Sequence, residues 1–204
     1  MTCGILSVTI LSCSEGNPKK PAQPTTTITI TLKVQKITDT LEALTDMAFP
    51  GNGEMGVTEQ GGKILSIRNG KLNSSPIMDL ESKMVKLDKS YEERGLLGIT
   101  LHPDFKSNKK FYVFYSRPSS SKTFNHTGVV SEYKLPGAGQ VDPDCDRIIL
   151  AVDEPVGNHN GCCFNVRPDG YLYISFDDGG GQHDQHGHNG NGQKLNPLLR
   201  QIVR

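Results

Sequence analysis

Asn158–Gly180 reads NHNGCCFNVRPDGYLYISFDDGG, and this stretch indicates what kind of fold the chain forms. Its centre, Arg167–Gly170 (RPDG), is a tight-turn sequence, because proline presets φ and glycine accepts a positive φ. Tyr171–Phe176 is rich in strand-forming residues, and the polar DDGG that follows ends the run. The pattern predicts loop, strand, turn, strand and loop, which brings His159 and Asp178 to the same edge of a sheet.

The composition favours a sheet protein and excludes some classes of partner. The 204 residues contain 22 Lys and Arg against 22 Asp and Glu, so nothing indicates binding to nucleic acid or to an anionic membrane. The 22 glycines and 12 prolines, with no tryptophan, indicate many turns and short strands. The five cysteines have no regular spacing and form no CxxC pair, so neither a disulfide framework nor a zinc ribbon is predicted.

The N-terminal residues resemble an export signal. Residues 1–13, MTCGILSVTILSC, are an apolar run too short to span a bilayer, and they lack the usual basic start. Ile10–Cys13 resembles a bacterial lipobox, so we expect an exported protein, periplasmic or at the cell surface, whose membrane contact is a lipid anchor at Cys13. The alternative is a frayed N-terminus or a misplaced start codon. Residues 14–35 are predicted to form a flexible tether and a first strand, since Thr27–Val34 alternates polar with apolar side chains.

The remaining residues, 36–204, repeat a pattern of strand, proline-containing turn and strand. The turns at Pro50, Pro103 and Pro168 are 53 and 65 residues apart. Self-similarity on this scale indicates an array of sheet units, of which a propeller blade is the commonest. About three such units do not close a ring, which favours a piece of a longer protein over pairing with a second copy. Further strands are predicted at 44–49, 63–67, 76–80, 96–101, 110–115, 129–135 and 147–152, with the opening of one more at 198–203.

His159 is the strongest candidate for chemistry. Histidine is the side chain whose ordinary pKa lets it act as a base near neutral pH, and here it lies in a polar loop. Asp178 would hold one imidazole tautomer, as the third member of a base relay does. The alternatives are a structural histidine and an ordinary turn carboxylate. Glu93 and Arg94 precede the apolar run Leu96–Ile99. They form either a solvated, charged turn or the mouth of a channel that also contains His159.

A histidine-rich loop raises the question of a metal. Gly179–Gln193 contains His183, Asp184, His186 and His188, and imidazole and carboxylate ligands suit zinc or copper. No strand or helix is predicted to fix their geometry, and a glycine-rich loop loses much conformational entropy when it is ordered. We therefore predict no metal site in this chain.

Several motifs, taken in order, resemble the soluble PQQ-dependent aldose (glucose/sorbosone) dehydrogenases. The resemblance runs from about Leu44 to Arg204, and the hedgehog-interacting-protein propellers, which are binding proteins, share much of it. The motifs are Val57–Gln60 with Gly62–Ile64, Glu93–Gly98 with His102–Phe105, His159–Gly161, and Pro168–Gly170 through Asp178–Gly180.

This resemblance implies an all-β, six-bladed β-propeller with pyrroloquinoline quinone (PQQ) in its central channel, of which the chain supplies about three blades, the N-terminal half. The histidine matching His159 takes the proton of the sugar's anomeric hydroxyl while hydride passes to the quinone, and the acid matching Asp178 supports that base. Cofactor contacts are implied for His159, for Glu93, where some members carry glutamine, and for the adjacent Arg94. Electrons would pass to a small-molecule or cytochrome acceptor.

At four positions the sequence departs from the family pattern. Cys162, Arg167, Asp177 and Arg200 stand where members commonly have glycine, and we expect such replacements to strain tight turns and close strand packing. The family's calcium ligands, and the basic residues that hold the quinone's carboxylates, belong to later blades. We therefore expect Ca²⁺ to have its ligands outside this chain and the cofactor site to be half built.

Three functional hypotheses follow. The first is a quinoprotein oxidoreductase that oxidises the anomeric hydroxyl of an aldose. The second is a non-catalytic propeller that binds a protein or a glycan at the cell surface. The third is a truncated or decayed gene product with no stable fold.

Overall fold

The computed structural model describes residues 31–51, 53–186, 190–191 and 198–204, and the chain divides into two units, Met1–Ile37 and Thr38–Arg204. In the first unit the described residues, 31–37, form no strand. The predicted export signal, Cys13 and most of the predicted tether lie outside the described residues.

The first strand predicted from the sequence, Thr27–Val34, is wrong over residues 31–34, while residues 27–30 lie outside the described part. Leu32 and Val34 are 69% and 90% exposed. Alternating polar and apolar residues form a stable strand only where a neighbouring strand takes up the backbone hydrogen bonds and an apolar face is covered. The described residues of this unit contain no such neighbour.

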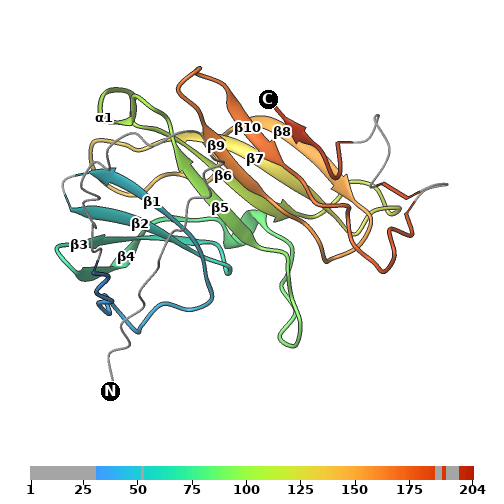
Figure 1. The fold of residues 1–204 in the computed structure, drawn as a ribbon, viewed down its shortest axis with the longest axis horizontal. Coiled ribbons are helices and arrows are strands. Elements are labelled where there is room, and N and C mark those ends of the chain that lie inside the picture. Colours follow the sequence, from blue (N-terminus) through green and yellow to red (C-terminus); the bar gives the residue numbers. More distant parts are fainter. Residues whose placement is uncertain (1–30, 52, 187–189, 192–197) are drawn as a thin grey trace, which may run out of the picture. The chain divides into compact units, whose positions relative to one another are not determined.

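Thr38–Arg204 consists of antiparallel sheets (Figure 1). The strands of the first two sheets follow chain order, so each of these sheets is a meander, and the third has the order β11-β10-β9. The first sheet contains β1 (Leu44–Gly51), β2 (Glu54–Glu59), β3 (Lys63–Arg68) and β4 (Lys71–Asp79); the second contains β5 (Leu96–Leu101), β6 (Lys110–Arg117), β7 (His126–Lys134) and β8 (Arg147–Glu154); the third contains β9 (Cys163–Val166), β10 (Leu172–Ser175) and β11 (Ile202–Val203).

Helices are short and lie in the connections between strands. The 3-10 helix η1 spans Glu81–Lys83 and the helix α1 spans Phe105–Asn108. Within the described part of the chain, no helix has both the length and the apolar character needed to cross a bilayer.

The proline turns predicted from the sequence are confirmed as equivalent hairpins. Pro50 lies at the end of β1, Pro103 lies between β5 and β6, and Pro168 lies between β9 and β10, so each turn joins the first two strands of a sheet. In the third turn Gly170 has a φ of +83° and donates its N–H to the carbonyl oxygen of Arg167 at 2.9 Å. The repeat in the sequence is therefore a repeat of sheets.

The first strands of successive sheets are neighbours, because β1 contacts β5 and β5 contacts β9 (Figure 1). Side chains of β1 join it to β5: Thr45 Oγ1 donates to the carbonyl oxygen of Leu96 at 2.8 Å. Asp46 Oδ2 accepts the N–H of Ile99 at 2.9 Å, beside the register shift where β5 leaves its regular pairing with β6. These bonds satisfy backbone groups of β5 that its own sheet leaves unpaired.

The core lies between the sheets, and β6 contributes to it on both faces. Phe111, Val113 and Tyr115 belong to a buried cluster shared with the first sheet, whereas Tyr112 and Phe114 belong to one shared with the third. Successive residues of a strand point to opposite faces, so the continuous apolar run of β6 fills both clusters. Full burial of one such side chain contributes about 1.5–3 kcal/mol.

Candidate active site

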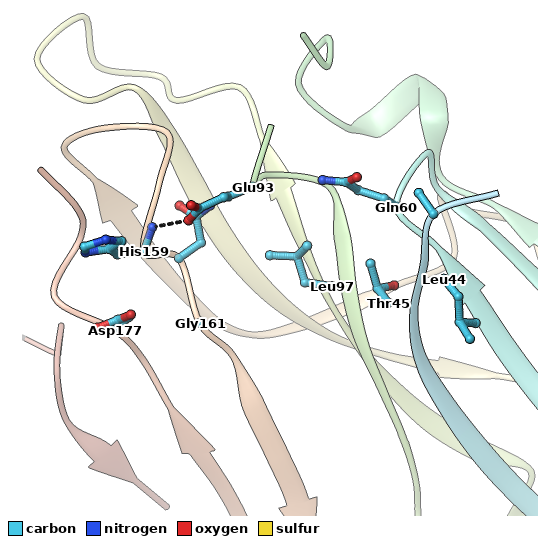
Figure 2. A pocket seen from close by; sticks show the side chains of 10 residues that line it. Leu44, Thr45, Gln60, Glu93, Leu97, His159, Gly161 and Asp177 are labelled. Atoms are coloured by element: carbon cyan, nitrogen blue, oxygen red, sulfur yellow. Dashed lines mark hydrogen bonds between the residues drawn. The ribbon is translucent and has the colours of Figure 1, made fainter. Parts of the chain in front are cut away.

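A cleft of about 440 Å³ opens where loops of the three sheets meet (Figure 2). Its walls come from the residue before β1 and the start of β1, the residue after β2, the loop before β5 and the start of β5, and the loops on either side of the β9–β10 hairpin. The lining residues are Ala43, Leu44, Thr45, Gln60, Glu93, Leu97, His159, Asn160, Gly161 and Asp177.

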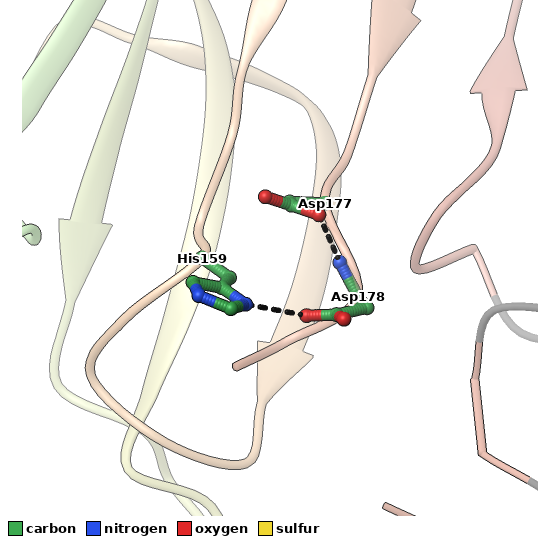
Figure 3. A group of neighbouring side chains, drawn as sticks. All are labelled: His159, Asp177 and Asp178. Atoms are coloured by element: carbon green, nitrogen blue, oxygen red, sulfur yellow. Dashed lines mark hydrogen bonds and ion pairs between the residues drawn. The ribbon is translucent and has the colours of Figure 1, made fainter. Parts of the chain in front are cut away.

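His159 and Asp178, predicted to meet at one sheet edge, are hydrogen-bonded to each other (Figure 3). The distance from His159 Nδ1 to Asp178 Oδ1 is 3.0 Å. The imidazole is 42% exposed and lines the cleft, whereas the Asp178 side chain is 12% exposed and lies behind it. Asp178 Oδ1 also accepts the N–H of Gly180 at 2.9 Å, and Asp177 Oδ1 accepts the N–H of Asp178 at 2.8 Å. The carboxylate that orients the imidazole is thus itself held by the backbone N–H of Gly180.

The electrostatics of this pair favour a charged imidazole beside a charged carboxylate. The hydrogen bond to Asp178 raises the pKa of His159 above its ordinary value, and the charges of Asp177 and Glu93 act in the same direction. Burial by itself would raise the pKa of Asp178, but the hydrogen bonds from Gly180 and His159 outweigh it and lower that pKa. Asp178 therefore remains ionised while His159 gains or loses a proton.

Unusual backbone conformations bring the two loops together. His159 has a φ of +55°, in the left-handed region. Gly180 has a φ of +90°, and a Cβ at this position would lie 2.4 Å from the carbonyl oxygen of Asn158. Only glycine permits this approach, which places the Gly180 N–H on Asp178 while its backbone packs against the loop that carries His159.

Glu93 contacts the main chain of the histidine loop. Its Oε2 accepts the N–H of His159 at 2.6 Å (Figure 2), and its Oε1 accepts a hydrogen bond from the Tyr91 hydroxyl. A carboxylate hydrogen bond to a backbone N–H is among the stronger kinds in proteins. Glu93 therefore fixes the histidine backbone and presents its carboxylate to the cleft at the same time.

Arg94, the neighbour of Glu93, is directed elsewhere. Its guanidinium bonds Glu92 through Nε at 2.8 Å and NH2 at 2.6 Å, and NH1 donates to Asn125 Oδ1 at 3.1 Å. Burial alone would raise the pKa of Glu92, but the hydrogen bonds from Arg94 prevail and lower it to about 2. Arg94 does not line the cleft, and its contacts hold the loop that carries Glu93.

One group of residues in the described part of the chain has the geometry to share a metal ion. It consists of His159, Asp177 and Asp178, whose ligand atoms all lie within 4.8 Å of one another. Of the histidine-rich loop, His188 lies outside the described residues, and His183 belongs to no such group. The potential ligands are thus the candidate base itself and the two carboxylates that follow β10.

Sequence reasoning missed several residues of the cleft. Gln60 was part of a motif, but its position at the cleft depends on contacts with the loop before β5. Asp177 stands out in the sequence only as a departure from glycine, although two consecutive carboxylates after a strand signal a polar site. Asn160, whose side-chain Nδ2 donates to the carbonyl oxygen of Gly157 at 3.1 Å, is buried beside His159.

The residues that stand in place of glycine differ in conformation. Arg200 has a φ of +59°, so the expectation of strain holds there. Cys162, Arg167 and Asp177 do not have positive φ values. The Arg167 guanidinium lies over the ring of Tyr173, 5.3 Å from its centroid, which gives this side chain a stabilising contact outside the turn.

Comparison with known proteins agrees with this architecture. A family model described as glucose/sorbosone dehydrogenase matches residues 41–204. The mouse Hedgehog-interacting protein is 32% identical over 157 residues, which are 72% of this chain and 22% of that protein. A glucose dehydrogenase-type oxidoreductase of Thermus thermophilus has 27% identity and a TM-score of 0.58, over 72% of this chain and 40% of the other.

The PQQ-bound aldose sugar dehydrogenase of Streptomyces coelicolor has a TM-score of 0.63 at 19% identity, over 84% of this chain and 46% of that one, and shows likeness of fold alone. The sheets described above are accordingly those of a β-propeller of the six-bladed kind, about three blades of it. The chain belongs to the glucose/sorbosone dehydrogenase family. It spans less than half the length of each of these relatives.

Proposed function

We propose that the protein is a PQQ-dependent oxidoreductase that oxidises the anomeric hydroxyl of an aldose, with His159 as the base. The hydrogen bond between His159 Nδ1 and the buried carboxylate of Asp178 carries this proposal. When the imidazole is neutral and donates from Nδ1, its Nε2 is left as a proton acceptor. That is the form a base needs toward a sugar hydroxyl in the cleft.

The residues of this chain would act in sequence on one proton. Nε2 of His159 accepts the hydroxyl proton, and the ionised Asp178 stabilises the imidazolium that results. Glu93 holds the histidine main chain through the hydrogen bond to its N–H. Glu93 and Asp177 also give the cleft carboxylate acceptors, which suit the hydroxyl donors of a sugar.

When bound, the cofactor would supply the acceptor for the hydride. Glu93 and His159 are proposed to lie beside it, but Glu93 and Asp177 are the acidic groups of the cleft, and its described lining contains no lysine or arginine. Arg94 is engaged by Glu92 and Asn125. The lining residues therefore do not fit the quinone's carboxylates, and we assign neither those contacts nor Ca²⁺ ligands to this chain.

The test is aldose-dependent reduction of a dye by the protein supplied with PQQ and Ca²⁺. His159→Ala is expected to abolish turnover without changing the unfolding midpoint. The matched control is His183→Asn, which changes another loop histidine of positive φ that does not line the cleft. Equal turnover in wild type and His159→Ala would remove His159 from the reaction.

A second function, a non-catalytic propeller that binds a protein or glycan, is favoured by the acidic cleft. A cleft whose described lining contains Glu93 and Asp177 but no lysine or arginine suits neutral or basic ligands better than a polyanion. The similarity to mouse Hedgehog-interacting protein points the same way. Failure of PQQ to change the absorbance or thermal stability of the protein at millimolar concentration would select this alternative.

The location of the protein is a further part of the proposal. We propose export to the periplasm or cell surface, with a lipid anchor at Cys13 and a small-molecule or cytochrome electron acceptor. Wild type is expected in the membrane fraction and Cys13→Ser in the soluble exported fraction. The same fraction for both would contradict the anchor.

A further inference from the structure

Gln60, just beyond the end of β2, joins three segments that meet at the cleft. Its backbone N–H donates to the carbonyl oxygen of Ala43 at 2.9 Å, and its own carbonyl oxygen accepts the N–H of Leu96 at 3.0 Å. Its side-chain Nε2 donates to the carbonyl oxygens of Glu92 and Arg94, each at 2.9 Å. Both protons of the amide are used in the last pair of bonds.

These two side-chain bonds lie on either side of Glu93. The amide holds the carbonyl groups before and after that residue, so it sets the direction in which the Glu93 side chain leaves the loop. Packing adds to this restraint at Gly95, which has a φ of +136°, and a Cβ there would lie 2.5 Å from the Gln60 carbonyl oxygen. The loop from Glu92 to Gly95 is therefore shaped closely around Gln60.

The contacts continue from Glu93 to the candidate base. Glu93 Oε2 accepts the N–H of His159, and the imidazole of His159 bonds Asp178. We propose that Gln60 is a positioning residue that, through Glu93, holds His159 in place across two sheets. The effect of Gln60 on catalysis rests on the function proposed above, whereas its effect on the position of His159 does not.

The test compares Gln60→Met, which keeps the length of the side chain and removes both donors, with Gln60→Ala. The matched control is Gln140→Met, because Gln140 Nε2 also donates to a carbonyl oxygen, that of Pro76 at 2.9 Å, on an exposed surface away from the cleft. The first measurement is the NMR titration of the His159 imidazole. The second is kcat and KM for aldose oxidation with PQQ and Ca²⁺.

Both Gln60 variants are expected to lower the pKa of His159 a little, because the charge of Glu93 moves away while the hydrogen bond to Asp178, the largest cause of the raised pKa, remains. They are also expected to reduce kcat by roughly tenfold to a hundredfold, the cost of misplacing a reacting group by about 1 Å, with little change in KM. A His159 titration and kcat like those of Gln140→Met would overturn the inference. A shifted titration in a protein whose wild type oxidises no aldose would support the inference and refute the proposed function.

Discussion

Glu93 and His159 are 66 residues apart in the chain, yet Glu93 Oε2 accepts the main-chain N–H of His159 at 2.6 Å. Glu93 lies in the loop before β5 and His159 in the loop before β9. These loops enter the first strands of the second and third sheets, and β5 and β9 are neighbours. The position of the candidate base therefore depends on a side chain from a different sheet.

Replacement of Glu93 tests this dependence. Glu93→Ala removes an acceptor for the His159 N–H and is expected to lower kcat/KM roughly tenfold to a hundredfold, since a hydrogen bond to a charged group contributes about 1.5–3 kcal/mol. Glu93→Gln keeps an oxygen acceptor and should lose less. Steady-state kinetics would show the order wild type, Gln, Ala. An Ala variant as active as the Gln variant would mean that the contact does not position the base.

The His159–Asp178 pair predicts a pH dependence. The base acts only when it is neutral, so activity should rise as pH passes upward through the pKa of His159, which Asp178 raises. Asp178→Asn removes that charge, and the acid limb of the kcat/KM profile should move to lower pH. The maximum should fall by roughly 10²–10⁴-fold, the usual contribution of general-base catalysis. Asp169→Asn, at the tip of the same hairpin, serves as the control, and an unmoved acid limb in Asp178→Asn would contradict the assignment.

A second polar pair is buried close behind this site. His126 and Glu154 face each other across β7 and β8, and neither has exposed surface. His126 Nε2 and both carboxyl oxygens of Glu154 have no hydrogen-bond partner. Burial, and then the charges of Asp177 and Asp178, raise the pKa of Glu154 to about 8, while burial lowers the pKa of His126 to about 4. Both side chains are therefore neutral near pH 7.

Because of the raised pKa of Glu154, the free energy of unfolding should fall as the solution becomes alkaline. Between its unfolded pKa of 4.5 and its folded pKa of about 8, the folded state binds the proton and the unfolded state does not, so stability decreases as pH rises. His126 acts in the opposite direction between about 4 and 6.5. Above pH 6.5 the raised pKa of His159 acts in the same direction as Glu154, so the effect of Glu154 is isolated by comparison with a variant that lacks its carboxyl group.

The free energy of unfolding should therefore drop by about 2 kcal/mol from pH 6.5 to 8, at about 1.4 kcal/mol per pH unit. Urea unfolding at these two pH values would measure it. Glu154→Gln cannot ionise and should remove the part of the decline that Glu154 causes. The same decline in Glu154→Gln as in wild type would assign it to other groups.

Much of this fold is local in the sequence, which is why it could be predicted. The run Phe111–Tyr115 is apolar or aromatic throughout because β6 is buried on both faces, and the turns at Pro50 and Pro168 lie where proline and glycine favour them. The strand predicted at 198–203 is confirmed only as β11, Ile202–Val203. Arg200, with its positive φ, turns the chain immediately before it.

Only those site residues whose side-chain type itself indicates a catalytic role could be predicted from the sequence. His159 and Asp178 have side chains suited to a base relay and flank one hairpin, so their pairing followed from topology. The position of Gln60 against the loop before β5 depends on how two sheets pack, which no local pattern encodes. The same is true of Arg94, whose engagement with Glu92 and Asn125 requires the folded chain.

The packing of β1 against β5 leads to a prediction about stability alone. Asp46 Oδ2 accepts the N–H of Ile99, on the side of β5 that faces away from β6, because β5 is the edge strand of its own sheet. Asp46→Ala would leave this buried donor unsatisfied, at a cost of about 1–3 kcal/mol. Asp88→Ala, which removes an exposed carboxylate bonded to the Ser90 N–H, is the control and should cost less. Chemical unfolding of both variants would measure the difference, and equal midpoints would show that water replaces Asp46 between the two sheets.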